Sequence, residues 1–161
     1  MHTPDLYDGK TFARVDDGVG YAKKVGFGEI GERGRRAAER LPNAIVYAGF
    51  SLGVMAAQAL AQTRAGAKGA LFFYACLPIS EFGGSWPASL PGQVHMMEKD
   101  PFALEGDLDA ARELAATAKN VELFVYPGDR HLFAENGTPD YEPKAAALLK
   151  QRTIAFLKAI K

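Results

Sequence analysis

One serine lies in a context typical of a catalytic nucleophile. Residues 49–53 read GFSLG, a G-x-S-x-G pattern with Ser51 at its centre, between the apolar run AIVYAGF and the alanine-rich stretch LGVMAAQALAQ. A sharp strand-to-helix turn would expose the hydroxyl, and Gly49 and Gly53 would remove side chains that obstruct the turn. We expect Ser51 to be a nucleophile, with the Leu52 backbone N–H stabilising an oxyanion. A glycine-serine turn that caps a helix is the alternative interpretation.

A serine hydroxyl needs a base to accept its proton, and the chain contains three histidines. His131 follows the apolar run VELFVYP, in the loop GDRHLF. That position is the carboxyl edge of the predicted sheet, where Ser51 should also lie. His95 is inside an apolar run, where a packed, hydrogen-bonded histidine is the commoner state, and His2 is at the terminus. We therefore expect His131 to be the base.

The imidazole in turn needs a carboxylate to fix its tautomer and to stabilise the imidazolium. Asp100 follows the run QVHMM by a few residues, at the same sheet edge. Asp107 and Asp109 fit the first turn of a helix, where capping would explain their presence. Asp129 is too near His131 in sequence to reach the far nitrogen of the imidazole easily. The resulting order of serine, aspartate and histidine along the chain is the order found in α/β-hydrolases.

Strand-like and helix-like segments alternate along the chain. Five apolar runs predict strands, at residues 2–6, 43–50, 68–75, 93–97 and 121–127. Helical patterns fall between and after them, near residues 30–41, 52–64, 107–118 and 149–160. Such alternation predicts an α/β fold, a three-layer arrangement with a mostly parallel sheet and helices on both faces. Functional groups are then expected at the carboxyl ends of the strands.

Aromatic residues near the proposed nucleophile and base could form an apolar pocket. Residues 80–92, SEFGGSWPASLPG, form the longest irregular stretch and are expected to be a lid or pocket wall. The candidates for the pocket are Phe50, Phe82, Trp86 and Phe133. Aromatic residues near strand ends are just as often part of a core.

The overall composition restricts the classes of partner. At 161 residues the chain is expected to form one domain, residues 1–161, and 19 basic against 19 acidic residues leave no net charge. No field draws such a chain to nucleic acid or to a membrane surface, so a small molecule is the expected partner. The N-terminus lacks the features of a signal peptide and the longest apolar run is too short to span a bilayer, which predicts a cytoplasmic protein.

No cofactor or metal is expected from the remaining residues. Cys76 lies in an apolar run as a small core residue, and the histidines and the cysteine show no metal-ligand spacing. Residues 26–31 satisfy G-x-G-x-x-G, but a helical pattern precedes them and no acidic residue follows at the distance needed for a ribose. The basic residues that follow are predicted to form a solvated helix face: Arg33, Arg35, Arg36 and Arg40.

Four stretches together resemble the dienelactone hydrolase family of α/β-hydrolases: TPDLYDG, GFSLG, MMEKDPF and ELFVYPGDRHLF. The resemblance runs over essentially the whole chain and implies Ser51 as nucleophile, Asp100 as acid and His131 as base. The family's namesake enzymes carry cysteine at the nucleophile position, so this chain is similar to a serine-bearing, esterase-like branch. Glu135 stands where members acting on anionic lactones can carry an arginine. Small neutral esters or lactones are therefore the expected substrates.

The resemblance also indicates an N-terminally shortened fold. Family members have a strand, a loop that supplies a second oxyanion N–H and a helix before the segment that matches TPDLYDG. A sheet without these elements exposes a strand edge and apolar helix faces, which predicts a homo-oligomer, most simply a dimer. The alternative is a five-stranded monomer in which residues 2–6 pair directly with residues 43–50. The alternative to a serine hydrolase is a binding or structural module that retains the three residues without activity.

Overall fold

The computed structural model describes residues 1–160, which divide into two compact units. Residues 1–42 form the N-terminal unit, and the chain from Asn43 onward forms the sheet unit. Each has its own set of internal contacts and is described by itself. The expectation of a single domain stays a prediction.

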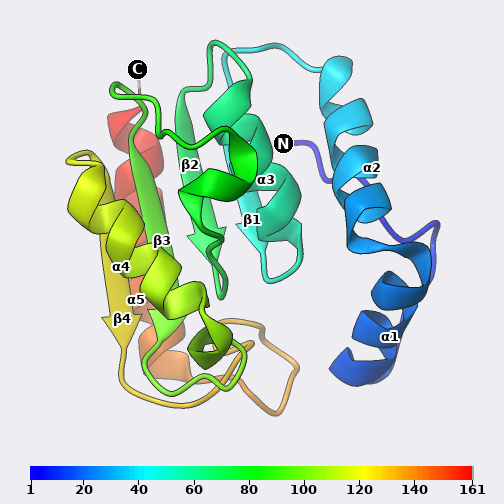
Figure 1. The fold of residues 1–161 in the computed structure, drawn as a ribbon. Helices are drawn as coiled ribbons and strands as arrows, with labels where there is room; N and C mark the ends of the chain where they lie inside the picture. Colours follow the sequence, from blue (N-terminus) through cyan, green and yellow to red (C-terminus); the bar gives the residue numbers. More distant parts are fainter. Residues whose placement is uncertain (161) are drawn as a thin grey trace. The chain divides into compact units, whose positions relative to one another are not determined.

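The sheet unit contains four parallel strands in the order of the sequence (Figure 1). They are β1 (Val46–Phe50), β2 (Gly69–Phe73), β3 (Gly92–Met97) and β4 (Val121–Tyr126). Figure 1 shows α3 (Gly53–Thr63) and α4 (Asp107–Thr117) on one face of the sheet and α5 (Pro143–Ala159) on the other. The predicted α/β fold, a mostly parallel sheet with helices on both faces, is confirmed.

The strands form where apolar runs can be buried on both faces. Every residue of β2 and β3, the two inner strands, is buried, as expected for parallel strands covered by helices. Two short 3₁₀ helices interrupt the connections, η1 (Ile79–Phe82) after β2 and η2 (Ala103–Glu105) after β3. No helix within residues 1–160 is both long enough and apolar enough to cross a membrane.

A row of aromatic rings crosses one face of the sheet in register. Phe50 is paired with Phe73, Phe73 with His95, and His95 with Phe124, so the four residues lie side by side on successive strands. Neighbouring rings are stacked with centroids 4.5 Å, 5.4 Å and 5.1 Å apart. The Arg152 guanidinium of α5 lies 4.2 Å from the centroid of Phe124 and closes the row.

The N-terminal unit consists of an extended segment and two helices, α1 (Val15–Val25) and α2 (Phe27–Glu39). The strand predicted at residues 2–6 is wrong. The Asp5 carboxylate accepts the backbone N–H groups of Tyr7 and Gly9, so the segment closes a turn where a strand would have continued. The rings of Tyr7, Phe12 and Tyr21 pack together above this turn, with centroids 5.3 to 6.0 Å apart.

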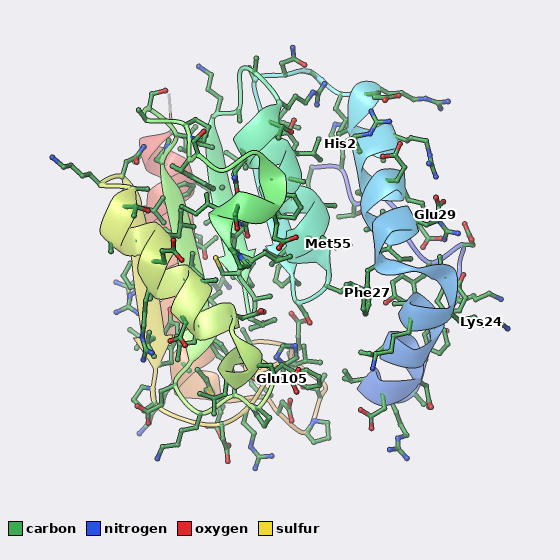
Figure 2. The ribbon with its side chains drawn as sticks, viewed as in Figure 1. His2, Lys24, Phe27, Glu29, Met55 and Glu105 are labelled. Carbon is green, nitrogen blue, oxygen red and sulfur yellow. The ribbon has the colours of Figure 1, made fainter. Side chains whose placement is uncertain are left out.

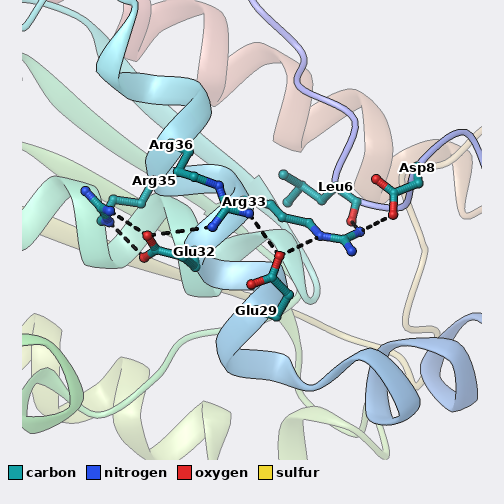
Figure 3. A network of polar contacts seen from close by, with 7 residues as sticks. All are labelled: Leu6, Asp8, Glu29, Glu32, Arg33, Arg35 and Arg36. Atoms are coloured by element: carbon teal, nitrogen blue, oxygen red, sulfur yellow. Dashed lines mark hydrogen bonds and ion pairs between the residues drawn. The ribbon is translucent and has the colours of Figure 1, made fainter.

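Helix α2 carries a network of charged side chains, drawn in Figure 3. Arg35 and Arg36 are exposed and pair with glutamates of the same helix, as expected for a solvated face. Arg33 is different, because its side chain is only 19% exposed and contacts the Leu6 carbonyl at 2.9 Å and Asp8 at 2.9 Å. Arg33 therefore fixes the N-terminal segment against α2.

The G-x-G-x-x-G stretch occupies a corner between two helices. Gly26 has φ +97° and precedes α2 directly after α1 ends, so no strand leads into the pattern. A dinucleotide-binding turn requires that strand.

Candidate active site

Ser51 lies at a strained turn between β1 and α3. Its N–H donates to the Phe73 carbonyl at 2.8 Å, which extends the β1–β2 ladder by one bond, and its backbone then adopts φ +49°. A Cβ at Gly49 would come within 2.5 Å of the Val54 Cα, so only glycine fits there. The turn is also expected from the sequence to require glycine at position 53. However, nothing lies within 4 Å of a Cβ built on Gly53, so a side chain would fit there. One glycine, not two, makes the turn possible.

A chain of hydrogen bonds joins the three residues selected from the sequence. The Ser51 Oγ lies 2.8 Å from the His131 Nε2, and the His131 Nδ1 lies 2.6 Å from the Asp100 Oδ2. Asp100 is 1% exposed and His131 is 7% exposed. A Nδ1–H that donates to the carboxylate leaves the Nε2 lone pair facing the serine hydroxyl, which is the arrangement that a general base needs.

The loop after β3 holds Asp100. The second carboxylate oxygen, Oδ1, accepts the Phe102 N–H at 3.0 Å, so both oxygens are bonded and the orientation is fixed. The Phe102 ring also packs against the imidazole of His131, with centroids 4.5 Å apart, while 39% of Phe102 stays exposed. Phe102 is not among the residues predicted from the sequence, although its place two residues after the predicted acid is a signal for it.

The loop after β4 holds His131. The Arg130 N–H donates to the Met97 Sδ, and the Leu132 N–H donates to the Asp140 carboxylate at 3.1 Å. The N–H groups on both sides of the histidine are therefore bonded to other segments. Such bonds keep an imidazole in place without contacting its reactive nitrogens.

Tyr74, which follows β2, contacts the same loop and is not among the residues predicted from the sequence. It is fully buried with φ +71°, a rare conformation for a bulky residue, and its N–H donates to the His95 carbonyl at 2.8 Å. Its ring lies 5.8 Å from that of His131, and its hydroxyl donates to the Glu135 carboxylate at 3.2 Å. Tyr74 and Ser51 thus end neighbouring strands in the same way, by a left-handed residue one bond beyond the ladder.

The backbone N–H of Leu52 is available to a ligand. Leu52 directly precedes α3, and its N–H makes no hydrogen bond within residues 1–160. An unpaired N–H at a helix N-terminus is a suitable donor to an oxyanion.

Asp107 is a further carboxylate near the hydrogen-bonded chain. It is the first residue of α4 and makes no capping bond to that helix, in contrast to the capping role expected for it. Burial raises the pKa of Asp107 to about 6, although a hydrogen bond from the Cys76 backbone and the nearby His131 act in the opposite direction. The side chain is therefore partly protonated near neutral pH.

The remaining candidates for acid and base have other partners. Asp109 pairs with Arg112 at 3.0 Å, and Asp129 pairs with Arg130 at 3.4 Å, both at the surface. His95 is fully buried within β3 and bonds to Tyr126, not to a carboxylate.

The four aromatic residues expected in the pocket have different surroundings. Phe50 is adjacent to Ser51 and is 50% exposed, whereas Phe133 is fully buried between Tyr74 and Tyr126. Trp86 packs against Phe72 and against Gly92, the first residue of β3 and so the end of that strand farthest from Asp100. The structure does not bring Trp86 close to the hydrogen-bonded series of Ser51, His131 and Asp100.

Two glutamines of α3 hold the segment that follows β2 against that helix through hydrogen bonds. The Gln58 side chain accepts the Leu77 N–H at 3.0 Å and donates to the Leu77 carbonyl at 2.7 Å. Four residues along the helix, Gln62 donates to the carbonyls of Ile79 at 3.0 Å and Phe82 at 3.2 Å. Because Gln62 is near the last turn of α3, Phe82 is held at the far end of that helix from Ser51. The stretch follows α3 and does not cover the nucleophile.

Cys76 lies next to this stretch and is fully buried, as expected. Burial raises the pKa of its thiol to about 12, which keeps the group neutral. Within residues 1–160, no group of three or more histidine, cysteine, aspartate or glutamate side chains is arranged to hold a metal ion.

The parallel sheet with helices on both faces, together with a hydroxyl, an imidazole and a buried carboxylate at its carboxyl edge, defines an α/β-hydrolase. The chain belongs to the dienelactone hydrolase family, whose model matches residues 29–161.

Individual relatives agree with this assignment. A putative carboxymethylenebutenolidase of Azospirillum brasilense is 41% identical over 71 residues, which cover 42% of this chain and 29% of that protein. A putative dienelactone hydrolase from Klebsiella pneumoniae has a similar structure, with a TM-score of 0.64, 19% identity and coverage of 97% of this chain and 73% of that chain. A dienelactone hydrolase-like promiscuous phosphotriesterase from metagenomic libraries gives a TM-score of 0.66 at 16% identity, over 97% of this chain and 72% of that chain.

Proposed function

We propose that this protein is a serine hydrolase that cleaves small esters or lactones through an acyl-enzyme. The observation that carries the proposal is the hydrogen-bonded series from Ser51 Oγ through His131 to Asp100, at 2.8 Å and 2.6 Å. Family membership supports a hydrolase in general, and the substrate class and the mechanism are our inference.

The geometry supports one sequence of proton transfers. The Ser51 oxygen attacks the carbonyl carbon while His131 Nε2 accepts the hydroxyl proton, and Asp100 stabilises the imidazolium that forms. The Leu52 N–H donates to the oxyanion. His131 then gives its proton to the leaving alkoxide, and a water molecule, deprotonated by the same nitrogen, releases the acid and restores the serine.

The test compares Ser51→Ala with Ser89→Ala, which removes an exposed serine from the connection between β2 and β3. We expect Ser51→Ala to lower the hydrolysis of a short p-nitrophenyl ester by roughly 10⁴-fold to 10⁶-fold, because the nucleophile is lost. Ser89→Ala should keep the parent rate. A neutral fluorophosphonate should label the parent protein stoichiometrically at Ser51.

Equal rates for Ser51→Ala and the parent would contradict the proposal. Failure of the fluorophosphonate to label well-folded protein would favour the alternative, a binding or structural module. The homodimer and the cytoplasmic location expected from the sequence stay predictions. The position of β1 at an edge of the sheet, with Phe50 half exposed, supports association through that edge.

A further inference from the structure

The loops around the proposed site carry an excess of negative charge. Residues 98–106 and 127–142 connect β3 to α4 and β4 to α5, and both lie at the carboxyl edge that bears Ser51. Together they contain seven acidic side chains and two basic ones. Glu105, labelled in Figure 2, lies in the first of these loops.

Both basic side chains of these loops are already paired with carboxylates. Lys99 contacts Glu98 at 4.0 Å, and Arg130 contacts Asp129 at 3.4 Å and Asp140 at 4.0 Å. These loops therefore offer no spare cation to receive an anionic substrate.

Asp100 bonds to His131 directly, whereas Glu135 is linked to that histidine through Tyr74, whose ring lies 5.8 Å from the imidazole. Glu135 lies four residues after His131 in the same loop and is partly buried. Its partner is the Tyr74 hydroxyl, a neutral donor, and within residues 1–160 no lysine or arginine forms an ion pair with it. Burial, followed by the Glu135 charge, raises the pKa of the Tyr74 hydroxyl, so the phenol stays protonated and donates its hydrogen bond to Glu135.

We propose that Glu135, fixed by Tyr74, is a specificity-determining residue that makes the site prefer esters with a cationic group over matched neutral ones, and disfavours anionic esters. The inference rests on the proposed hydrolase function. Glu135 is partly buried, and partly buried charges are screened by salt less than charges on the open surface, for which the Debye length is about 10 Å at 0.1 M. The preference concerns encounter and binding of substrate, and the chemical steps stay those given above.

The test uses two acetate esters of the same shape, one of choline and one of 3,3-dimethylbutanol, which differ by one positive charge. We expect kcat/KM to be about threefold to tenfold higher for the choline ester at low salt. The ratio should fall toward one as the salt concentration approaches about 1 M, where the Debye length is short.

Three variants locate the effect. Glu135→Gln should lower the ratio by about threefold, and Tyr74→Phe, which releases the carboxylate without removing its charge, should lower it less. Glu113→Gln makes the same charge change on the exposed side of α4 and should leave the ratio unchanged. The thermal midpoint of each variant is measured alongside, so that the ratio is taken from folded protein.

A ratio of one or below in the parent, or a ratio that Glu135→Gln does not change, would overturn the inference. Equal cleavage of both esters leaves the proposed hydrolase function intact. Cleavage of neither ester, with no labelling of Ser51, overturns the proposed function and the inference together.

Discussion

Two buried histidines, one within β3 and one in the loop after β4, have opposite surroundings in this protein. His95 is inside β3, stacked between Phe73 and Phe124, with its Nδ1 2.9 Å from the Tyr126 hydroxyl and its Nε2 3.2 Å from the Gln93 amide oxygen. His131 is in a loop beyond β4, between a serine hydroxyl and a carboxylate. Burial alone therefore does not mark a catalytic histidine.

The partners decide which histidine can accept a proton. Burial, and then the charge of Arg152, lowers the pKa of His95 to about 3, so its imidazole stays neutral at physiological pH. His131 has Asp100 beside it, and a carboxylate stabilises the imidazolium at the moment it forms. A neutral histidine that bonds only to neutral groups serves packing, whereas a histidine with a carboxylate behind it can serve catalysis.

The largest expected effect is the difference in activity between a substitution of His131 and the same substitution of His95. His131→Gln should reduce ester hydrolysis by roughly 10⁴-fold or more, since the base is lost. His95→Gln should keep turnover within about tenfold of the parent but lower the free energy of unfolding by about 2 to 4 kcal/mol, because a stacked, bonded ring is removed from the core. Turnover and urea unfolding of both variants measure this. If His95→Gln lowered turnover as much as His131→Gln, the packing role assigned to His95 would be wrong.

The second prediction concerns the pH dependence of stability. The folded-state pKa of His95 lies below the ordinary value of 6.5, so its contribution is fully present above pH 6.5 and is lost as the pH falls toward about 3. The stability difference between the parent and His95→Gln should therefore shrink by about 2 to 3 kcal/mol between pH 7 and pH 4.5. Urea unfolding at both pH values checks this. A difference that stays constant would show that His95 is not held neutral by the fold.

The smallest expected effect concerns the ring beside His131. Phe102→Ala should lower kcat by about threefold to tenfold, because the imidazole loses the contact that limits its motion. Phe102→Leu, which keeps apolar bulk at the same place, should recover most of the loss. Stability should change by less than about 1 kcal/mol, since Phe102 is 39% exposed. If Phe102→Ala lowered the free energy of unfolding strongly and left kcat unchanged, Phe102 would be a core residue like the rings that stack on His95.

The sequence predicted those parts of the molecule that depend on long apolar runs and on the order of strand ends. Four of the five predicted strands form, and the segments after β1, β3 and β4 bring Ser51, Asp100 and His131 to one edge. The run at residues 2–6 failed because it is short, and the side chain of Asp5 competes for the backbone N–H groups that follow it.

Two other features, the path of the segment after β2 and the conformation of Tyr74, could not be predicted from the sequence. The path of the stretch after β2 depends on amides of α3 that bind its carbonyls, so proximity in sequence gave no indication that Trp86 lies far from Ser51. The left-handed conformation of Tyr74 is imposed by its tertiary contacts and not by residue type, since tyrosine rarely adopts it.

The position of Trp86 also determines how this protein can be observed in solution. It is the single tryptophan of the chain, its indole N–H donates to the Leu90 carbonyl at 2.8 Å, and its ring meets Phe72 edge-on. Its fluorescence thus reports on the packing of β2 and β3, at the opposite end of the sheet from Ser51. We expect emission from this indole to follow denaturation of the sheet unit and to respond little to a ligand at Ser51, so titrations of substrate analogues require a reporter introduced elsewhere.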